Sequence, residues 1–356
     1  MTDKAPLEGI RVVEWLSDAC SDAVGLAIGL AGRIAADLGA EILQIDAPAI
    51  AARRQCAPLI EGIGATALFL DRNKRRIPAA LFNPGATATA ADGTPLITIY
   101  LADAANHTAL ALQGAHSLAL TSDRAAATAA PDTEFTLLAV GGLLDLVGDI
   151  DRQPMRLGGH QLAYSAGLAL YAGIAAEIGR RRDGGAPDTL HVNLADVAVW
   201  LNWKSVASAT LTNRLPTRLG DGAEWRTIRC KDGWVALVYL EADWAGLKTL
   251  VNDPRLDDPR YDDRLTRRRE ATIINAIVEA AFLTYSRNDL RALALARRLP
   301  LGPVWSPAEL EHDPHYVARE FLRRVPGETG TTTLQPALPV MWNGHRFDGP
   351  TADVAA

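Results

Sequence analysis

Cysteine is scarce in this chain of 356 residues. The three cysteines, Cys20, Cys56 and Cys230, lie far apart, with no CxxC pair and no neighbouring histidine. A disulfide framework or a zinc site needs such spacings, so the sequence indicates neither, and we expect no metal site. We expect buried, reduced thiols, as is usual in a cytoplasmic protein.

Long apolar runs and an excess of positive charge are also missing. No run reaches the roughly 20 residues of a membrane-spanning helix, and the opening residues MTDKAP lack the hydrophobic region of a signal peptide. Lys and Arg number 36 against 42 Asp and Glu, which gives a net charge of −6. A protein that neutralises many phosphates is usually basic. We therefore expect a cytoplasmic protein that binds neither nucleic acid nor a membrane.

The composition that remains is globular, with 48% hydrophobic and 22% charged residues. Residues 9–15 and 41–46 read as buried strands around a helix at 26–38, which is the opening βαβ unit of an α/β domain. Three glycines, at 25, 29 and 32, fall at helical spacing inside that helix. Such glycines favour close helix packing, and they do not form the glycine-rich turn of a nucleotide site.

Further along the chain, strands and helices continue to alternate. We expect strands at 96–100 and 117–120, a strand or helix entry at 135–140, a helix through 168–178, a strand at 190–194 and a helix at 196–207. Residues 211–224 form a connector, 225–240 a hairpin, 241–311 a helical region, and the tail from 331 is strand-like. At this length, we expect a large and a small domain.

Residues 72–76 concentrate four cations, Arg72, Lys74, Arg75 and Arg76. Such a run is commonly a solvated loop. The alternative is a phosphate clamp, in which lysine supplies a point charge and arginine a bidentate fork.

Several patches, in the order in which they occur, resemble the family III CoA-transferases, which include formyl-CoA transferase, carnitine CoA-transferases and α-methylacyl-CoA racemase. They are PLEGIRVVE at 6–14, GRIAADLGAEI at 32–42, DRNKR at 71–75, the hairpin at 225–238, and a closing signature that runs from LGPV at 301–304 to REF at 319–321. Each patch alone is weak, but the ordered set is strong.

The resemblance implies a Rossmann-like large domain formed by both chain ends, 1–210 and 313–356, with a smaller α+β domain at 211–312. It implies an interlocked dimer with a homologous subunit, and acyl-CoA thioesters and small carboxylic acids as ligands, with no covalently bound cofactor. In the family, the lysine and arginine of the NKR motif lie near the nucleotide end of coenzyme A. Lys74 and Arg75, with Arg72 and Ser17, are therefore the coenzyme-binding candidates.

The stretch GGHQLAYSAG at 158–167 aligns with the family's site motif, D/E-Y-x-x-G. In the family, the carboxylate of this motif is the nucleophile. Here that position is Ala163, and a methyl group cannot form the acyl anhydride that the transfer requires. In the racemase branch the aspartate is again Ala163, and the histidine position falls near Thr133, so both partners are missing. His160 as a base and Tyr164 as a proton donor are the candidate substitutes.

Two further loops depart from the family pattern. The N-F-x-P-G loop expected near 100–108 and the S-x-x-G-x-x-G-P loop expected after 118 have lost their glycines, and 101–107 and 119–124 read LADAANH and ALTSDR. These changes affect segments that contact the coenzyme in the family, and they favour natural divergence over an engineered change at 163.

Four interpretations remain open at this point. The preferred one is a transferase subunit without its own nucleophile, paired with a catalytic homologue. The others are a repurposed enzyme that uses different groups, a non-catalytic scaffold that binds coenzyme A, and an engineered alanine at 163. An Ala163→Asp variant in a thioester-exchange assay would show whether the rest of the site is intact.

Overall fold

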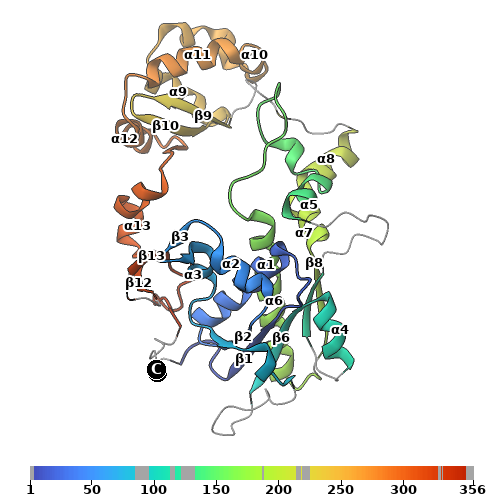
Figure 1. The fold of residues 1–356 in the computed structure, drawn as a ribbon. Coiled ribbons are helices and arrows are strands. Elements are labelled where there is room, and N and C mark those ends of the chain that lie inside the picture. Colours follow the sequence, from blue (N-terminus) through green and yellow to red (C-terminus); the bar gives the residue numbers. More distant parts are fainter. Residues whose placement is uncertain are drawn as a thin grey trace. The chain divides into compact units, whose positions relative to one another are not determined.

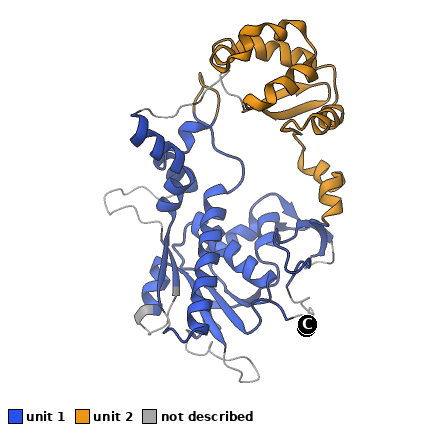
Figure 2. Cartoon of the chain, turned by 180° about the vertical axis from the view of Figure 1, so that it is seen from behind, with its two compact units in different colours: residues 1–147, 154–216, 320–356 blue, residues 148–153, 217–319 orange. Residues whose placement is uncertain are grey.

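The computed structural model describes residues 4–84, 96–112, 117–121, 133–186, 188–213, 218, 225–327, 330 and 332–349 (Figure 1). The chain divides into two compact units (Figure 2). The large unit comprises 1–147, 154–216 and 320–356, and the small unit comprises 148–153 and 217–319. The domain boundaries expected near 210 and 312 stay a prediction, and most of the expected connector at 211–224 lies outside the described residues.

A six-stranded parallel sheet forms the centre of the large unit, in the order β5-β2-β1-β6-β7-β8. Its strands are β1 (Ile10–Trp15), β2 (Glu41–Ile45), β5 (Arg75–Ile77), β6 (Ile97–Asp103), β7 (Ser117–Thr121) and β8 (Leu190–Asn193). The apolar run of β1 is continuous because a parallel strand is buried on both faces. The predicted α/β fold is therefore confirmed.

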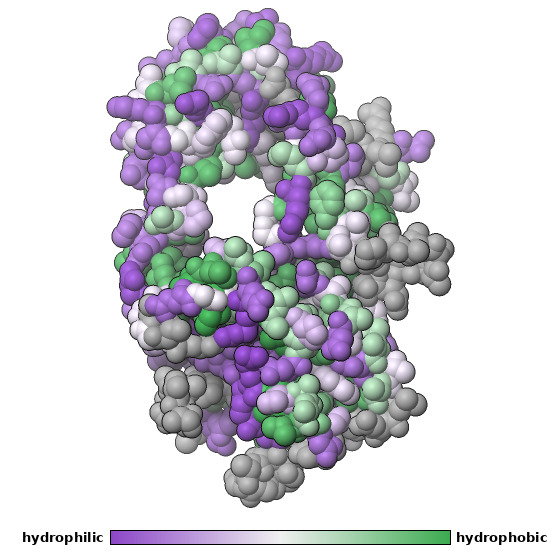
Figure 3. Space-filling view, in the orientation of Figure 1, coloured by the Kyte–Doolittle hydropathy of each residue, from purple (hydrophilic) through white to green (hydrophobic). Residues whose placement is uncertain are grey.

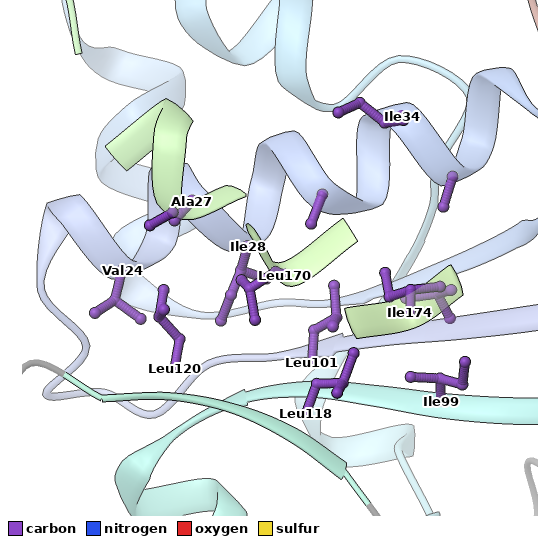
Figure 4. Close-up of a cluster of buried hydrophobic side chains, with 14 of the residues drawn as sticks. Val24, Ala27, Ile28, Ile34, Ile99, Leu101, Leu118, Leu120, Leu170 and Ile174 are labelled. Carbon is purple, nitrogen blue, oxygen red and sulfur yellow. The ribbon is translucent and has the colours of Figure 1, made fainter. Parts of the chain in front are cut away.

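Helices cover both faces of this sheet. Helices α1 (Asp22–Asp37) and α6 (Gln161–Arg182) pack together on one face, and α4 (Ala104–Leu112) lies on the other. Figure 4 shows the first of these cores, where Ile28 and Leu170 of the two helices meet Leu118 of the sheet. Side chains alternate along a strand, so Val12 belongs to this core and Val13 to the core on the α4 side.

Shorter elements complete the large unit. They are α2 (Pro48–Gln55), β3 (Leu59–Ile60), β4 (Ile63–Gly64), α3 (Ala65–Leu70), α5 (Glu134–Val140), α7 (Leu194–Leu201), α8 (Trp203–Thr212), β12 (Leu322–Pro326), β13 (Thr332–Pro336) and 3₁₀ turns at Ala79–Leu81 and Leu144–Leu146. The β12–β13 hairpin and the tail join the N-terminal part. The Gln335 side chain donates to the Leu68 carbonyl at 3.2 Å, and Leu338 enters the main core. Both chain ends therefore build one unit.

The small unit is an antiparallel sheet, β9 (Trp225–Cys230), β10 (Gly233–Val238) and β11 (Leu301–Pro303), packed on helices. The helices are α9 (Trp244–Val251), α10 (Arg264–Arg269), α11 (Ala271–Phe282), α12 (Arg287–Arg297) and α13 (Pro314–Ala318), with 3₁₀ turns at Glu241–Asp243, Pro254–Asp257, Pro259–Asp262 and Pro307–His312. The predicted hairpin is confirmed. The helical region predicted at 241–311 is confirmed for most of its length, and the strand β11 near its end was not predicted, because three residues with a glycine and a proline are too short to show strand alternation.

Among the described residues, α6 is the one helix long and apolar enough to cross a membrane by length and composition. The expectation that no apolar run reaches this length is therefore wrong for α6. It is also the central core helix of the large unit, since Leu162, Ala166, Leu170 and Ile174 are fully buried against α1 and the sheet. Burial inside a protein core explains such an apolar helix without a membrane. Cytoplasmic localisation stays a prediction.

Candidate active site at the start of helix α6

Ala163 lies in the first turn of α6, and its methyl group is fully buried. It packs in a small apolar cluster with Leu26 of α1 and Leu70 of α3. The position predicted for the missing nucleophile is therefore filled by a hydrophobic contact, and no polar group of residue 163 is available for chemistry.

A carboxylate reaches this place from another element. Glu134, the first residue of α5, is 8% exposed, and its Oε1 accepts hydrogen bonds from the backbone N–H of Leu162 at 2.9 Å and of Ala163 at 3.4 Å. The first N–H groups of a helix have no partner within the helix and attract negative charge. His160, the N-cap residue of α6, makes no capping bond with its side chain. Glu134 thus caps α6 in its place.

The second oxygen of Glu134 holds His160. Oε2 lies 3.0 Å from His160 Nδ1, and Arg156 donates to the same oxygen at 3.4 Å. A carboxylate oxygen accepts hydrogen bonds, so the contact favours a proton on Nδ1, and in the neutral imidazole this leaves Nε2 as an acceptor. Within the described part of the chain no hydrogen bond engages Nε2, and the His160 side chain is 37% exposed. This is the arrangement of an oriented imidazole base.

His160 opens onto a pocket of about 180 Å³. The pocket lies between α1, α2, the start of α3 and the start of α6, and its lining includes Asp22, Leu26, Arg53, Cys56, Thr66 and His160. Leu26 also contacts Ala163, so the pocket adjoins the position predicted for the nucleophile. The structure therefore brings His160, but not the side chain of residue 163, to a cavity large enough for the end of a small ligand.

Tyr164 packs beside Ala163 and its ring centroid lies 5.9 Å from that of His160. Burial raises the pKa of the Tyr164 phenol, the charge of Arg53 opposes this shift, and the charge of Glu134 adds to it. Tyr164 therefore keeps its proton, as the donor role requires, and its catalytic role stays a prediction.

The expectation of three buried thiols is wrong for Cys56. Cys230 is buried and Cys20 is half-buried, and burial, with the nearby charges of Asp103 and Asp22, raises the pKa of Cys20 to about 12. Cys56 is exposed at the C-cap of α2, where the helix ends on the rim of the pocket. Sequence spacing carried no signal for this exposure, because it depends on where α2 ends.

Lys74 lies in the interior of the large unit. Its side chain is 0% exposed, and Nζ donates to Glu14 at 2.5 Å and to the Gly29 carbonyl at 2.8 Å. Burial lowers the pKa of Lys74, and Glu14 and Asp71 oppose this shift. The run at 72–76 is thus neither a simple solvated loop nor an open clamp, and a coenzyme role for Lys74 stays a prediction that this geometry does not favour.

Two of the α1 glycines make room for buried charged side chains, Gly32 for the Lys74–Glu14 pair and Gly29 for Arg53. A Cβ at Gly32 would lie 1.8 Å from Glu14 Oε1, and a Cβ at Gly29 would lie 3.1 Å from Arg53 Nη1. The prediction that these glycines serve close packing is confirmed, and the neighbours that they admit are charged side chains as well as apolar ones.

The other coenzyme candidates also have protein partners. Arg75 is 63% exposed and pairs with Glu41 at 3.2 Å, whereas Arg72 donates to the Asp348 carbonyl at 3.4 Å. Ser17 donates through its hydroxyl to Asp103. Their coenzyme role stays a prediction. Of the altered loops, 101–107 forms the end of β6 and the start of α4, and 122–124 lies outside the described residues.

Glu134 is the residue that the sequence did not reveal. Thr133 caps α5 together with Thr136, so an acid in the first turn of that helix has an ordinary local explanation. Only the fold, which brings α5 to the start of α6, shows that the carboxylate serves a second helix 28 residues later in the chain.

Comparison with known proteins identifies the family to which this chain belongs. A sequence model described as CoA-transferase family III matches residues 122–353, more than half of the chain. The chain belongs to CoA-transferase family III. The resemblance noted in the sequence is thereby confirmed.

Relatives and solved structures agree with this membership. The chain is 26% identical over 222 residues to (R)-2-hydroxy-4-methylpentanoate CoA-transferase of Clostridioides difficile, covering 60% of this chain and 56% of that relative. It is 23% identical to succinate–glutarate CoA-transferase of Agrobacterium fabrum, over 99% and 94% of the two chains. A CaiB/BaiF family protein from Brucella suis has the same fold, with a TM-score of 0.75 at 21% identity over 97% of this chain and 95% of that one.

Proposed function

We propose that this chain is a family III CoA-transferase subunit that takes part in moving coenzyme A between acyl-CoA thioesters and small carboxylic acids. We further propose that it lacks a nucleophile of its own and pairs with a homologous subunit that has one. The relatives named above, which carry CoA-transferase names, support the reaction class. The buried methyl of Ala163 is the observation that carries the second part.

The chemistry explains why a partner is required. Transfer through a covalent intermediate needs a carboxylate that can attack the thioester carbon. Ala163 has none. Glu134 is near, but both of its oxygens are engaged, by two backbone N–H groups on one side and by His160 and Arg156 on the other. A second subunit is therefore the proposed source of the nucleophile.

An exposed apolar surface on α7 and α8 supports such a partner. Trp200 is 76% and Trp203 59% exposed, and with Val199 and Val206 they line a shallow groove. Figure 3 shows hydrophobic surface over the region of α7 and α8. Large aromatic side chains that are exposed together are typical of protein interfaces. The interlocked arrangement of the dimer belongs to this proposal.

The proposal is tested by isolating the chain, with an affinity tag, from the cells that produce it. Native mass measurement gives the composition of the complex, and a labelled acyl-CoA with an acceptor acid gives the transfer rate. We expect a complex with a homologous subunit that transfers, an isolated chain that does not, and loss of the complex in a Trp200→Asp, Trp203→Asp variant. A stable homodimer with full turnover would remove the proposal.

A second candidate is a repurposed enzyme in which His160 and Tyr164 act on an acyl-CoA or an acid. The position of His160 on the pocket favours it. If a His160→Gln, Tyr164→Phe variant keeps the full activity of the chain, this candidate is wrong. Tight binding of coenzyme A in calorimetry without any turnover would favour a non-catalytic scaffold instead.

A further inference from the structure

We propose that Glu134 and His160 form a positioned base that hydrolyses acyl-CoA thioesters in the pocket beside Ala163. Glu134 is the positioning residue, and His160 is the catalytic residue. The inference rests on the acyl-CoA ligand of the proposed function, but it assigns to this chain alone a reaction that needs no nucleophile at residue 163.

The first support is the fixed geometry of the carboxylate. Glu134 is held by the N–H groups of Leu162 and Ala163, so its Oε1 cannot turn toward the histidine. The position of Oε2 is thereby fixed, and it lies 3.0 Å from His160 Nδ1. A base whose orientation and tautomer are set by a buried carboxylate is the arrangement that general base catalysis needs.

The second support is the position of the imidazole on the pocket. His160 lines the pocket, whereas Glu134 is buried behind it. The imidazole is therefore the group of this pair that a water molecule in the pocket can reach. Other charged or titratable groups around His160 include Asp22, Arg53, Cys56, Arg156 and Tyr164.

The reaction balances without any further reagent. Nε2 of His160 takes a proton from water as the water oxygen bonds to the thioester carbonyl carbon. The carbon–sulfur bond then breaks, and the proton moves from Nε2 to the departing thiolate. The products are a carboxylic acid and the free thiol of coenzyme A, and the imidazole returns to its starting state.

The decisive variant is Glu134→Gln. The glutamine carbonyl can still accept from Leu162 and Ala163, so the cap of α6 is kept. Its amide, however, presents N–H to His160, so Nδ1 must accept and the proton moves to Nε2. An imidazole in this tautomer is not a base on the pocket side, and a reversed tautomer can lower turnover by orders of magnitude.

The measurements are thiol release from a short-chain acyl-CoA and the ¹⁵N spectrum of the histidines, on the full chain. We expect kcat to fall at least about a hundredfold in Glu134→Gln and in His160→Gln. In Glu134→Gln the His160 signals should change from the Nδ1–H to the Nε2–H pattern while the melting temperature stays close to the parent value. Unchanged hydrolysis in either variant would overturn the proposal.

Cys56 supplies a separate measure of ligand binding. It is exposed on the pocket, whereas Cys20 is half-buried and Cys230 is buried, so a maleimide should label Cys56 first. If acyl-CoA does not slow this labelling, the acyl-CoA ligand of the proposed function fails, and this inference fails with it. If acyl-CoA protects Cys56 but His160→Gln still hydrolyses it, only the present inference fails. Loss of hydrolysis in Cys56→Ser would point to thiol attack and would also overturn it.

Discussion

At the scale of single residues, Ala163 occupies a place that suits a methyl group and resists a charge. Its side chain is 0% exposed among Leu26 and Leu70, and its backbone N–H already faces the carboxylate of Glu134. A second carboxylate here would be buried, unpaired and next to a like charge, and each of these conditions is unfavourable.

We therefore expect Ala163→Asp to lower the free energy of unfolding by on the order of 3 kcal/mol near neutral pH. Urea denaturation measures this loss. Ala172→Asp is the matched control, because Ala172 lies on the same helix with an exposed side chain. Equal losses in the two variants would contradict the buried position of residue 163.

Gly32 gives a second test at this scale. A Cβ there would overlap Glu14 in its buried ion pair with Lys74, so we expect Gly32→Ala to cost on the order of 3 kcal/mol. Gly179→Ala, on exposed α6 backbone with nothing near its Cβ, should instead be stabilising by less than about 1 kcal/mol. Thermal and urea unfolding compare the pair, and a neutral Gly32→Ala would disprove the packing explanation.

At the scale of elements, the small unit contains an acid-sensitive link. Arg287 of α12 donates to Glu309 at 2.6 Å, and this bond, with the Ser306 backbone N–H, lowers the pKa of Glu309 from 4.5 to about 2. A carboxyl whose pKa is lower in the folded state stabilises that state above its unfolded pKa. This stabilisation is lost as pH falls from about 4.5 to about 2.

We expect the protection of residues 306–312 against hydrogen exchange, taken relative to the intrinsic exchange rate at each pH, to fall as the pH falls over that window. In Glu309→Gln, protection should already be low at neutral pH and should change little across the window. Glu279→Gln, on the exposed side of α11, should behave like the parent chain. A parent chain with the same protection at both ends of the window would show that the link does not hold this segment.

Elements also differ in how far the sequence predicts them. The opening βαβ unit and the hairpin around residue 232 were predictable, because their apolar periods and turn residues are local signals. Strands β3 and β4 have two residues each, and β11 has three, so no period can mark them. A motif in the sequence singles out Ala163, whereas the contact of Glu134 with the start of α6 depends on α5 meeting α6 across 28 residues of sequence.

At the scale of the whole molecule, both chain ends build one α/β unit that carries the candidate site. The chain belongs to CoA-transferase family III and shares its fold with a CaiB/BaiF family protein, and the position that the sequence motif predicts for the nucleophile is a buried alanine. We propose two separate roles on this basis. In this proposal the chain contributes a pocket and a base, and a partner subunit contributes the covalent nucleophile of CoA transfer.

Intact-protein mass measurement tests this separation most directly. The purified chain, as Cys56→Ser to remove the exposed thiol, is incubated with an acyl-CoA, denatured and weighed. The account predicts an unchanged mass while thiol is slowly released into solution. A mass gain equal to the acyl group or to coenzyme A on a carboxylate of this chain, with Glu134 as the first residue to examine, would contradict it.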